Sequence, residues 1–88
     1  MQITNYMEEA VKRTLDELLT EPPYQSMNFT EKMKLDISAY ALNHLPPRYV
    51  VTEKGLLYTR VDELKQQFRT DIVVELSKAI QQVHANPR

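Results

Sequence analysis

The 88-residue chain contains no cysteine and only one glycine. The absence of cysteine excludes disulfide bonds, thiolate metal sites and cysteine nucleophiles. One glycine is too few for the loops that hold phosphates in Walker-type and dinucleotide-binding folds, and it disfavours hairpin-rich all-β folds. Several common kinds of site are therefore excluded before any motif is considered.

A surplus of positive charge and long apolar runs are also missing. Eleven basic residues stand against 12 acidic ones, for a net charge of −1, so direct binding of DNA is not expected. Without a signal peptide or 18 consecutive apolar residues, the chain is expected to be cytoplasmic and to make no membrane contact. Residues 1–88 are too few to bury a large core, and we expect one domain that forms a homodimer.

Apolar residues spaced by threes and fours predict a first helix. Asn5 and Glu8 have the spacing of a capping box, so the helix should begin near Tyr6. Its predicted core face consists of Met7, Ala10, Val11, Leu15, Leu18 and Leu19. The prolines of Thr20–Pro23 end it, and residues 24–29 are predicted to form a loop or a short helical turn.

A second helix is predicted from Glu31 to His44, with Thr30 as its N-cap. It must stop before Pro46 and Pro47, because proline lacks a backbone N–H and forces the preceding residue out of the α region. Its apolar residues occupy more than one face: Met33, Ile37, Ala39, Tyr40, Ala41, Leu42 and Leu45. We therefore expect a central helix, packed against its own chain on one side and a partner subunit on the other.

The remaining chain reads as a short extended region followed by helix. Residues 50–59 contain two β-prone runs around Glu53-Lys54-Gly55, which predicts either a small irregular hairpin or an extended arm. Helical periodicity returns at Val61 and continues to Asn86-Pro87, as one helix bent near Arg69 or as two, with Thr70-Asp71 as a possible cap. The predicted fold class is all-α: three to four helices with a short extended or hairpin segment after the Leu-Pro-Pro turn.

Few residues suggest catalysis or metal binding. His44 and His84 each stand at a predicted helix end, where a cation complements the helix dipole. That placement is preferred over metal ligation because no carboxylate stands at metal-motif spacing to either histidine. The serines offer no set of nucleophile, base and orienting group. We therefore expect no enzyme, no metal and no cofactor.

The central segment carries a family resemblance. The chain reads Ala-Leu-Asn-His-Leu-Pro-Pro-Arg-Tyr-Val over residues 41–50, with Lys34 and Asp36 before it and Gly55 after it. This pattern resembles the ComFB family, the small late-competence-development proteins of bacteria. The similarity extends less sharply to residues 5–8, 67–73 and 86–88.

The resemblance has one clear departure, which concerns zinc. Many family members carry a cysteine cluster before the central helix that resembles a zinc-binding arrangement. Here the matching positions hold Asn28, Thr30 and Met33, none of which is a thiolate ligand. Zinc is therefore not expected, and dimer packing should contribute more to stability.

Relatives with the same core are described as receptors for cyclic dinucleotides, cyclic di-GMP in particular, and the resemblance implies such a ligand. It requires cations for two phosphates, planar groups for purine stacking and acceptors for the guanine edge. A twofold dimer would present every residue twice, matching the symmetry of the ligand. The candidate ligand-binding residues are Lys34, Asp36, Asn43, Arg48, Tyr49, Arg60 and Arg69.

Specific roles follow from the chemistry of these side chains. Lys34 and Arg48 are the preferred phosphate contacts, Tyr49 or Arg69 the stacking group, and Asp36 an acceptor for the guanine edge. Each role is implied by the resemblance and is an expectation at this point.

Every candidate also has a structural alternative. Asp36 can pair with Lys32 or Arg48, Asn43 can hydrogen-bond the chain where it turns, and Tyr49 can be a packed aromatic. The other arginines can be solvated charge. A second functional hypothesis therefore stays open: an adaptor of competence or surface-motility machinery that binds a protein partner and no nucleotide.

Overall fold

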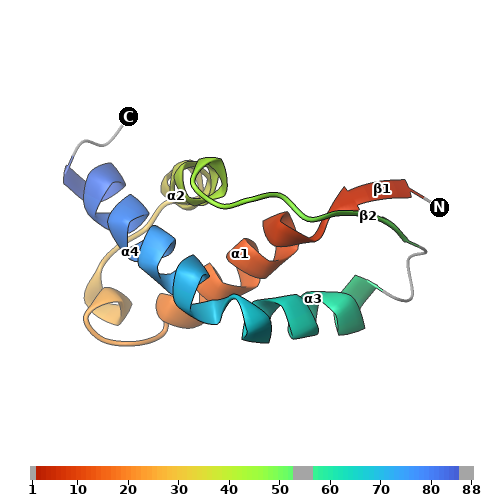
Figure 1. Ribbon diagram of the computed structural model, residues 1–88. Helices are drawn as coiled ribbons and strands as arrows, with labels where there is room; N and C mark the ends of the chain where they lie inside the picture. Colours follow the sequence, from red (N-terminus) through yellow and green to blue (C-terminus); the bar gives the residue numbers. More distant parts are fainter. Residues whose placement is uncertain (1, 53–56, 86–88) are drawn as a thin grey trace.

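The computed structural model describes residues 2–52 and 57–85. In these ranges the chain forms four α-helices, two strands and one short 3-10 helix, namely β1 (Gln2–Asn5), α1 (Tyr6–Leu18), η1 (Tyr24–Ser26), α2 (Glu31–Asn43), β2 (Tyr49–Thr52), α3 (Leu57–Gln67) and α4 (Arg69–Ala85). The molecule is elongated, 39 × 23 × 21 Å, with the two strands at one end (Figure 1). The predicted all-α class is confirmed.

Helix α1 shares the centre of the fold with α4. Its N-terminus begins as predicted, because the side-chain oxygen of Asn5 accepts a hydrogen bond of 3.1 Å from the Met7 N–H, and Glu8 and Glu9 follow in the first turn. Its buried residues are Tyr6, Met7, Ala10, Val11, Thr14, Leu15 and Leu18. The sequence suggested α2 for the central position, but α1 and α4 each pack against all three other helices.

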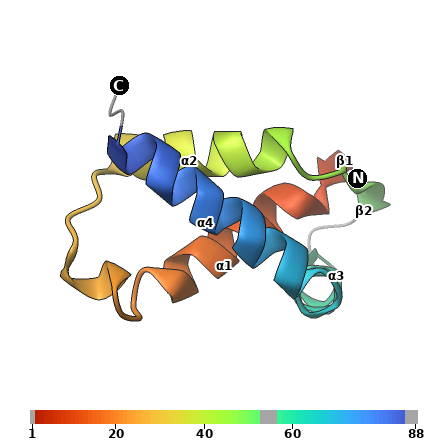
Figure 2. The ribbon, with the colours of Figure 1, turned by 60° about the vertical axis from the view of Figure 1, so that its left-hand side comes forward.

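Helix α2 lies alongside α4 and α1 (Figure 2). Thr30 caps it by accepting a hydrogen bond of 3.1 Å from the Met33 N–H, and it ends at Asn43, shortly before the two prolines. Ile37 and Ala41 are fully buried. Of the predicted apolar residues Ala39 is exposed and Tyr40 half-buried, so the wide apolar surface predicted for this helix is only partly covered by its own chain. Leu35, which was not part of that prediction, is 71% exposed.

The extended segment after the prolines is confirmed, but its partner differs from the predicted one. β2 pairs antiparallel with β1, in a register that places Ile3 opposite Val51 and Asn5 opposite Tyr49. The prediction of a second β-run at 56–59 is wrong for 57–59, which belong to α3. The predicted turn at 53–55 and residue 56 lie outside the described residues. We call the pair β1 and β2 the ribbon.

The C-terminal half consists of two helices in succession. α3 ends at Gln67 and α4 begins at Arg69, so helix starts one residue before the predicted Thr70-Asp71 cap. The backbone stays hydrogen-bonded through Phe68, which donates to Leu64 at 3.0 Å and accepts from Ile72 at 2.9 Å. The core contributions of α4 are Ile72, Leu76, Ala79, Ile80 and Val83. The predicted stop at residues 86–87 lies outside the described residues.

Candidate functional site

Asn5 connects the start of α1 to the segment that follows the prolines. Its side-chain oxygen accepts a second hydrogen bond, of 2.8 Å, from the Arg48 N–H. The Tyr6 N–H donates to the Arg48 carbonyl oxygen at 2.9 Å. Both backbone polar groups of Arg48 are therefore bonded to the first residues of α1, which fixes the point at which β2 begins.

The side chain of Arg48 contacts the C-terminal half of the chain, at the junction of α3 and α4. Its guanidinium carbon lies 4.6 Å from the centroid of the Phe68 ring, a distance typical of a cation–π contact. Arg48 is nevertheless an exposed residue. A guanidinium that lies over an aromatic ring keeps its N–H groups in its own plane, where they can still bind a phosphate.

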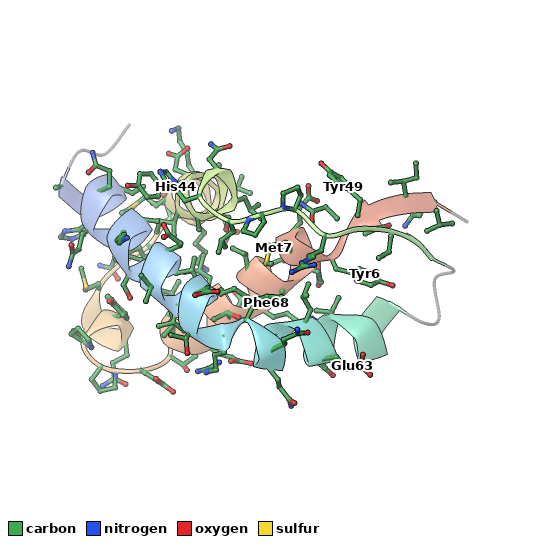
Figure 3. The ribbon with its side chains drawn as sticks, viewed as in Figure 1. Tyr6, Met7, His44, Tyr49, Glu63 and Phe68 are labelled. Atoms are coloured by element: carbon green, nitrogen blue, oxygen red, sulfur yellow. The ribbon has the colours of Figure 1, made fainter. Side chains whose placement is uncertain are left out.

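Tyr49 is 67% exposed and points away from α1 and α3 (Figure 3). Its own chain does not bury it, which disfavours the packed-aromatic alternative. Successive side chains of a strand leave it on opposite faces, so Tyr49 and Arg48 lie on different sides of the ribbon. Tyr49 thus presents a free aromatic face from a backbone that is held at its base.

The two α2 candidates are engaged in local ion pairs. Asp36 accepts from Lys32 at 3.0 Å, which is one of the structural alternatives left open by the sequence. Lys34 lies 3.3 Å from Glu31. Residues two apart on a helix do not face each other, so Lys34 and Asp36 do not converge on one point.

Lys34 borders a groove between α1 and α2. The groove has a volume of about 380 Å³ and is lined by Glu8, Lys12, Leu15, Asp16, Glu31, Lys34, Leu35, Ser38 and Leu42. Three leucines supply its apolar lining, and three carboxylates and two lysines supply its charged lining. A lining with an acidic surplus is unfavourable for a ligand that carries two phosphates.

A second cavity, of about 300 Å³, lies beside the proline turn. It is lined by His44, Leu45, Pro46, Asp71, Val74 and Glu75. One carboxylate oxygen of Glu75 is buried and has no hydrogen-bond partner among the described residues, and the other lies 3.6 Å from Lys78. This cavity is also acidic, so it too is unsuitable for a phosphate.

Arg69 participates in an ion-pair cluster that joins α1 to the C-terminal helices. Glu17 accepts from Lys65 at 2.6 Å and from Arg69 at 3.1 Å. The hydrogen bond from Lys65 lowers the pKa of the Glu17 carboxyl, partial burial opposes this, and the bond from Arg69 lowers the pKa further. Arg69 is therefore committed to a structural contact within the chain.

The Glu17 cluster predicts a pH dependence of stability. Because folding lowers the Glu17 pKa, the stabilisation is present above the pKa of the unfolded chain and is lost as pH falls through the pKa of the folded chain. The pairs are partly exposed, so we expect Glu17→Gln to cost at most about 1 kcal/mol near neutral pH. The difference from the parent protein should shrink toward acid pH in urea titrations at several pH values.

Glu63→Gln is the matched control, because Glu63 is exposed on the outer side of α3 (Figure 3). We expect this variant to unfold like the parent at every pH. A cost of Glu17→Gln that grows as pH falls would contradict the assigned ion pairs.

The other candidates are spread over the molecule. Asn43 is exposed at the last residue of α2, and Arg60 lies in α3, where its side chain is outside the described residues. Lys34 lies near the start of α2 and Arg48 follows its C-terminal end, so about 13 Å of helix, at 1.5 Å per residue, separates Lys34 from Asn43 alone. One chain therefore does not bring the two preferred phosphate contacts together.

Both histidines stand at helix ends, as predicted. The Nδ1–H of His44 donates to the Tyr40 carbonyl oxygen at 2.7 Å, and the two rings stack with centroids 4.5 Å apart. His84 lies in the last turn of α4. Among the described residues, no three histidine, cysteine or acidic side chains gather where they could hold a metal ion.

Two contacts were not anticipated from the sequence. Asn5 was recognised as a helix cap, but its bond to Arg48 was not, because no local pattern connects residues so far apart. Nothing in the spacing of charges indicated the pairing of Glu17 with Lys65 and Arg69.

The arrangement defines a class of protein: a small four-helix domain in which the chain start pairs with the strand that follows a Leu-Pro-Pro turn. No helix in the described ranges is long and apolar enough to cross a membrane. The family model of the late competence development protein ComFB matches residues 4–87. The chain belongs to the ComFB family.

A solved structure supports the same conclusion. The chain is similar to the late competence protein ComFB from Bacillus subtilis, with a TM-score of 0.77 and 25% sequence identity. The match covers 99% of this chain and 93% of the other. No curated protein matches the sequence.

Proposed function

We propose that the protein is a homodimeric receptor for cyclic di-GMP in which Tyr49 stacks on a purine base. The carrying observation is the 67% exposure of Tyr49 on a strand whose base is fixed by the hydrogen bonds between Asn5, Tyr6 and Arg48. A side chain on a backbone that is already ordered loses less freedom when a base stacks on it than one on a disordered loop. The family resemblance supports the choice of ligand.

Arg48 is the phosphate contact that best suits this arrangement. Its exposed guanidinium can offer two parallel N–H donors to a phosphate, a charge-assisted contact stronger than a neutral hydrogen bond. In a single chain Arg48 and Tyr49 point to opposite sides of β2. A ligand that contacts both groups at once therefore needs a second subunit, and this is why a homodimer forms part of the proposal.

Calorimetric titration with cyclic di-GMP tests the proposal. We expect saturable binding with a simple ratio of ligand to chain, and no comparable binding of cyclic di-AMP or GTP. Stacking of one base on an aromatic ring contributes about 1–3 kcal/mol, so Tyr49→Ala should weaken binding by roughly 5- to 150-fold. Tyr49→Phe keeps the ring and should bind like the parent protein. Equal loss in both variants would contradict the stacking role.

The adaptor function is the alternative, and the α1–α2 groove favours it. Its lining combines Leu15, Leu35 and Leu42 with charged residues. A surface with this chemistry can receive an amphipathic helix from a protein partner. If the folded protein gives no heat with any of the three nucleotides, this second function replaces the first.

A further inference from the structure

Helix α1 carries two rows of charged residues, each of which reads acidic, basic, acidic at intervals of four. The first row is Glu9, Arg13 and Glu17, and the second row is Glu8, Lys12 and Asp16. Residues four apart on a helix lie one above the other on the same face. At 3.6 residues per turn the two rows border the buried face of α1 on its two sides.

The first row is paired with the C-terminal helices. Arg13 contacts Asp62 of α3 at 3.2 Å, and Glu17 contacts Lys65 of the same helix at 2.6 Å. Because the residue numbers of these partners rise together, α3 runs in the same general direction as α1 (Figure 1). The first row therefore shows how this chain holds a helix beside α1.

The sequence of α3 combines apolar and charged residues in one short pattern. Val61 and Leu64 are buried in the core, and each is followed directly by a charged residue, Asp62 and Lys65. The helix thus presents an apolar and an acidic residue, and three positions later an apolar and a basic residue. We call this the α3 pattern. It buries apolar surface while its charges meet opposite charges on α1.

The second row has the same order of charges but no helix beside it. All three of its side chains are exposed, and none has an ion pair or hydrogen bond to another residue within 2–52 and 57–85. They line the α1–α2 groove together with Leu15 and Leu35, and Leu35 is 71% exposed. The row extends over about 12 Å at 1.5 Å per residue, the length of two turns of a partner helix.

We propose that the α1–α2 groove binds a helix of a partner protein that has the α3 pattern and runs in the same direction as α1. Its acidic residue pairs with Lys12, its basic residue with Asp16, and its apolar residues cover Leu35. The opposite direction would place like charges together, which opposes binding. The inference rests on the adaptor function proposed above and specifies the chemistry and orientation of its partner.

A synthetic peptide with the sequence of residues 57–69 is the probe, because it contains the α3 pattern. Isolated helices of this length are marginal in water. A covalent bridge between positions 63 and 67, which are four apart and both exposed in α3, therefore holds the peptide helical without using the docking face. We expect the bridged peptide to bind the folded protein saturably, as measured by fluorescence anisotropy.

Leu35→Asp tests whether the peptide occupies the groove. We expect this variant to bind the peptide roughly tenfold more weakly or worse, because the peptide would bury a carboxylate without a partner. Val51→Asp is the matched control, since Val51 is 66% exposed but lies on β2. It should bind the peptide like the parent protein. Circular dichroism checks that both variants fold.

An exchange of charges tests the pairing and the direction. Protein with both Lys12→Glu and Asp16→Lys should bind the peptide roughly five- to tenfold more weakly, because two exposed ion pairs become repulsions. A peptide with the charges at positions 62 and 65 exchanged should prefer this variant over the parent protein. The exchange leaves every apolar residue in place, so unspecific apolar adhesion would give no such reversal.

The outcomes separate this inference from the receptor function. Absence of saturable binding by the bridged peptide overturns the inference, as does equal binding of both charge orders. Self-association of the parent protein that Leu35→Asp abolishes also overturns it, because a second copy would then occupy the groove. Protein that binds cyclic di-GMP but not the peptide keeps the receptor function and loses this partner. Protein that binds the peptide but no nucleotide keeps the partner and the adaptor function alone.

Discussion

A Leu76→Ala variant is expected to lose about 2–5 kcal/mol of its free energy of unfolding. Leu76 is fully buried in α4, the helix that packs most extensively against α2. Removing its branched end leaves a cavity that the surrounding helices can only partly fill. Domains are stable by only about 5–15 kcal/mol in total, so this one change removes much of the stability. Urea denaturation followed by circular dichroism measures it.

Val74→Ala provides the control on the same helix. Val74 is 44% exposed, and its truncation should change the stability by no more than about 0.5 kcal/mol. If the two variants unfold at the same urea concentration, the assignment of Leu76 to the core is wrong.

Asn5→Ala is expected to cost about 1–3 kcal/mol. The loss of an N-cap contributes about 0.5–2 kcal/mol, and the loss of the hydrogen bond from the Arg48 N–H about 0.5–1.5 kcal/mol. The loss of the N-cap affects the start of α1, and the loss of the second hydrogen bond affects the base of β2. Urea denaturation measures the total, and hydrogen exchange of the Arg48 amide should become faster in the variant.

Asn5→Asp tests whether the side-chain oxygen alone is sufficient, or whether the whole amide group is needed. An aspartate keeps an oxygen for both N–H groups and places a negative charge at the helix N-terminus, where it is favourable. We expect this variant to be nearly as stable as the parent protein. Unchanged exchange at Arg48 in Asn5→Ala would show that its amide does not depend on Asn5.

The first two helices were predictable because their ends are determined locally. Asn5 and Thr30 accept hydrogen bonds from N–H groups two and three residues ahead, and Pro46 and Pro47 stop α2 by their own chemistry. Such signals involve neighbouring residues, so the sequence displays them directly. The apolar spacing of α1 likewise identified most of the residues that the structure buries, but it missed Tyr6 and Thr14.

Only one strand of the ribbon was predictable, because the pairing of its two strands depends on residues far apart in the sequence. β2 was recognised as extended from its valines, but β1 has just four residues and its partner lies far along the chain, so no short-range pattern connects them. Residues 57–59 look β-prone in isolation. In the structure they begin α3, whose later residues Val61 and Leu64 are buried in the core, and this packing overrides local preference.

The candidate site was also predictable only in part. The exposure of Tyr49 agrees with the role expected for it. The sequence could not reveal that Arg69 is engaged by Glu17 or that Lys34 stands at the far end of α2 from Arg48. Those facts depend on how helices pack against each other, and the spacing of charged residues does not encode it.

The pairing of β1 with a strand beyond α2 has a consequence for biosynthesis. β1 leaves the ribosome before α1 and α2, and its partner β2 does not exist until Thr52 has been added. During that interval Asn5 can cap α1, but Arg48 is not yet available to it, and the apolar side chain of Ile3 has no strand beside it. A translational pause before β2 would therefore prolong the period in which the nascent chain exposes an unpaired strand.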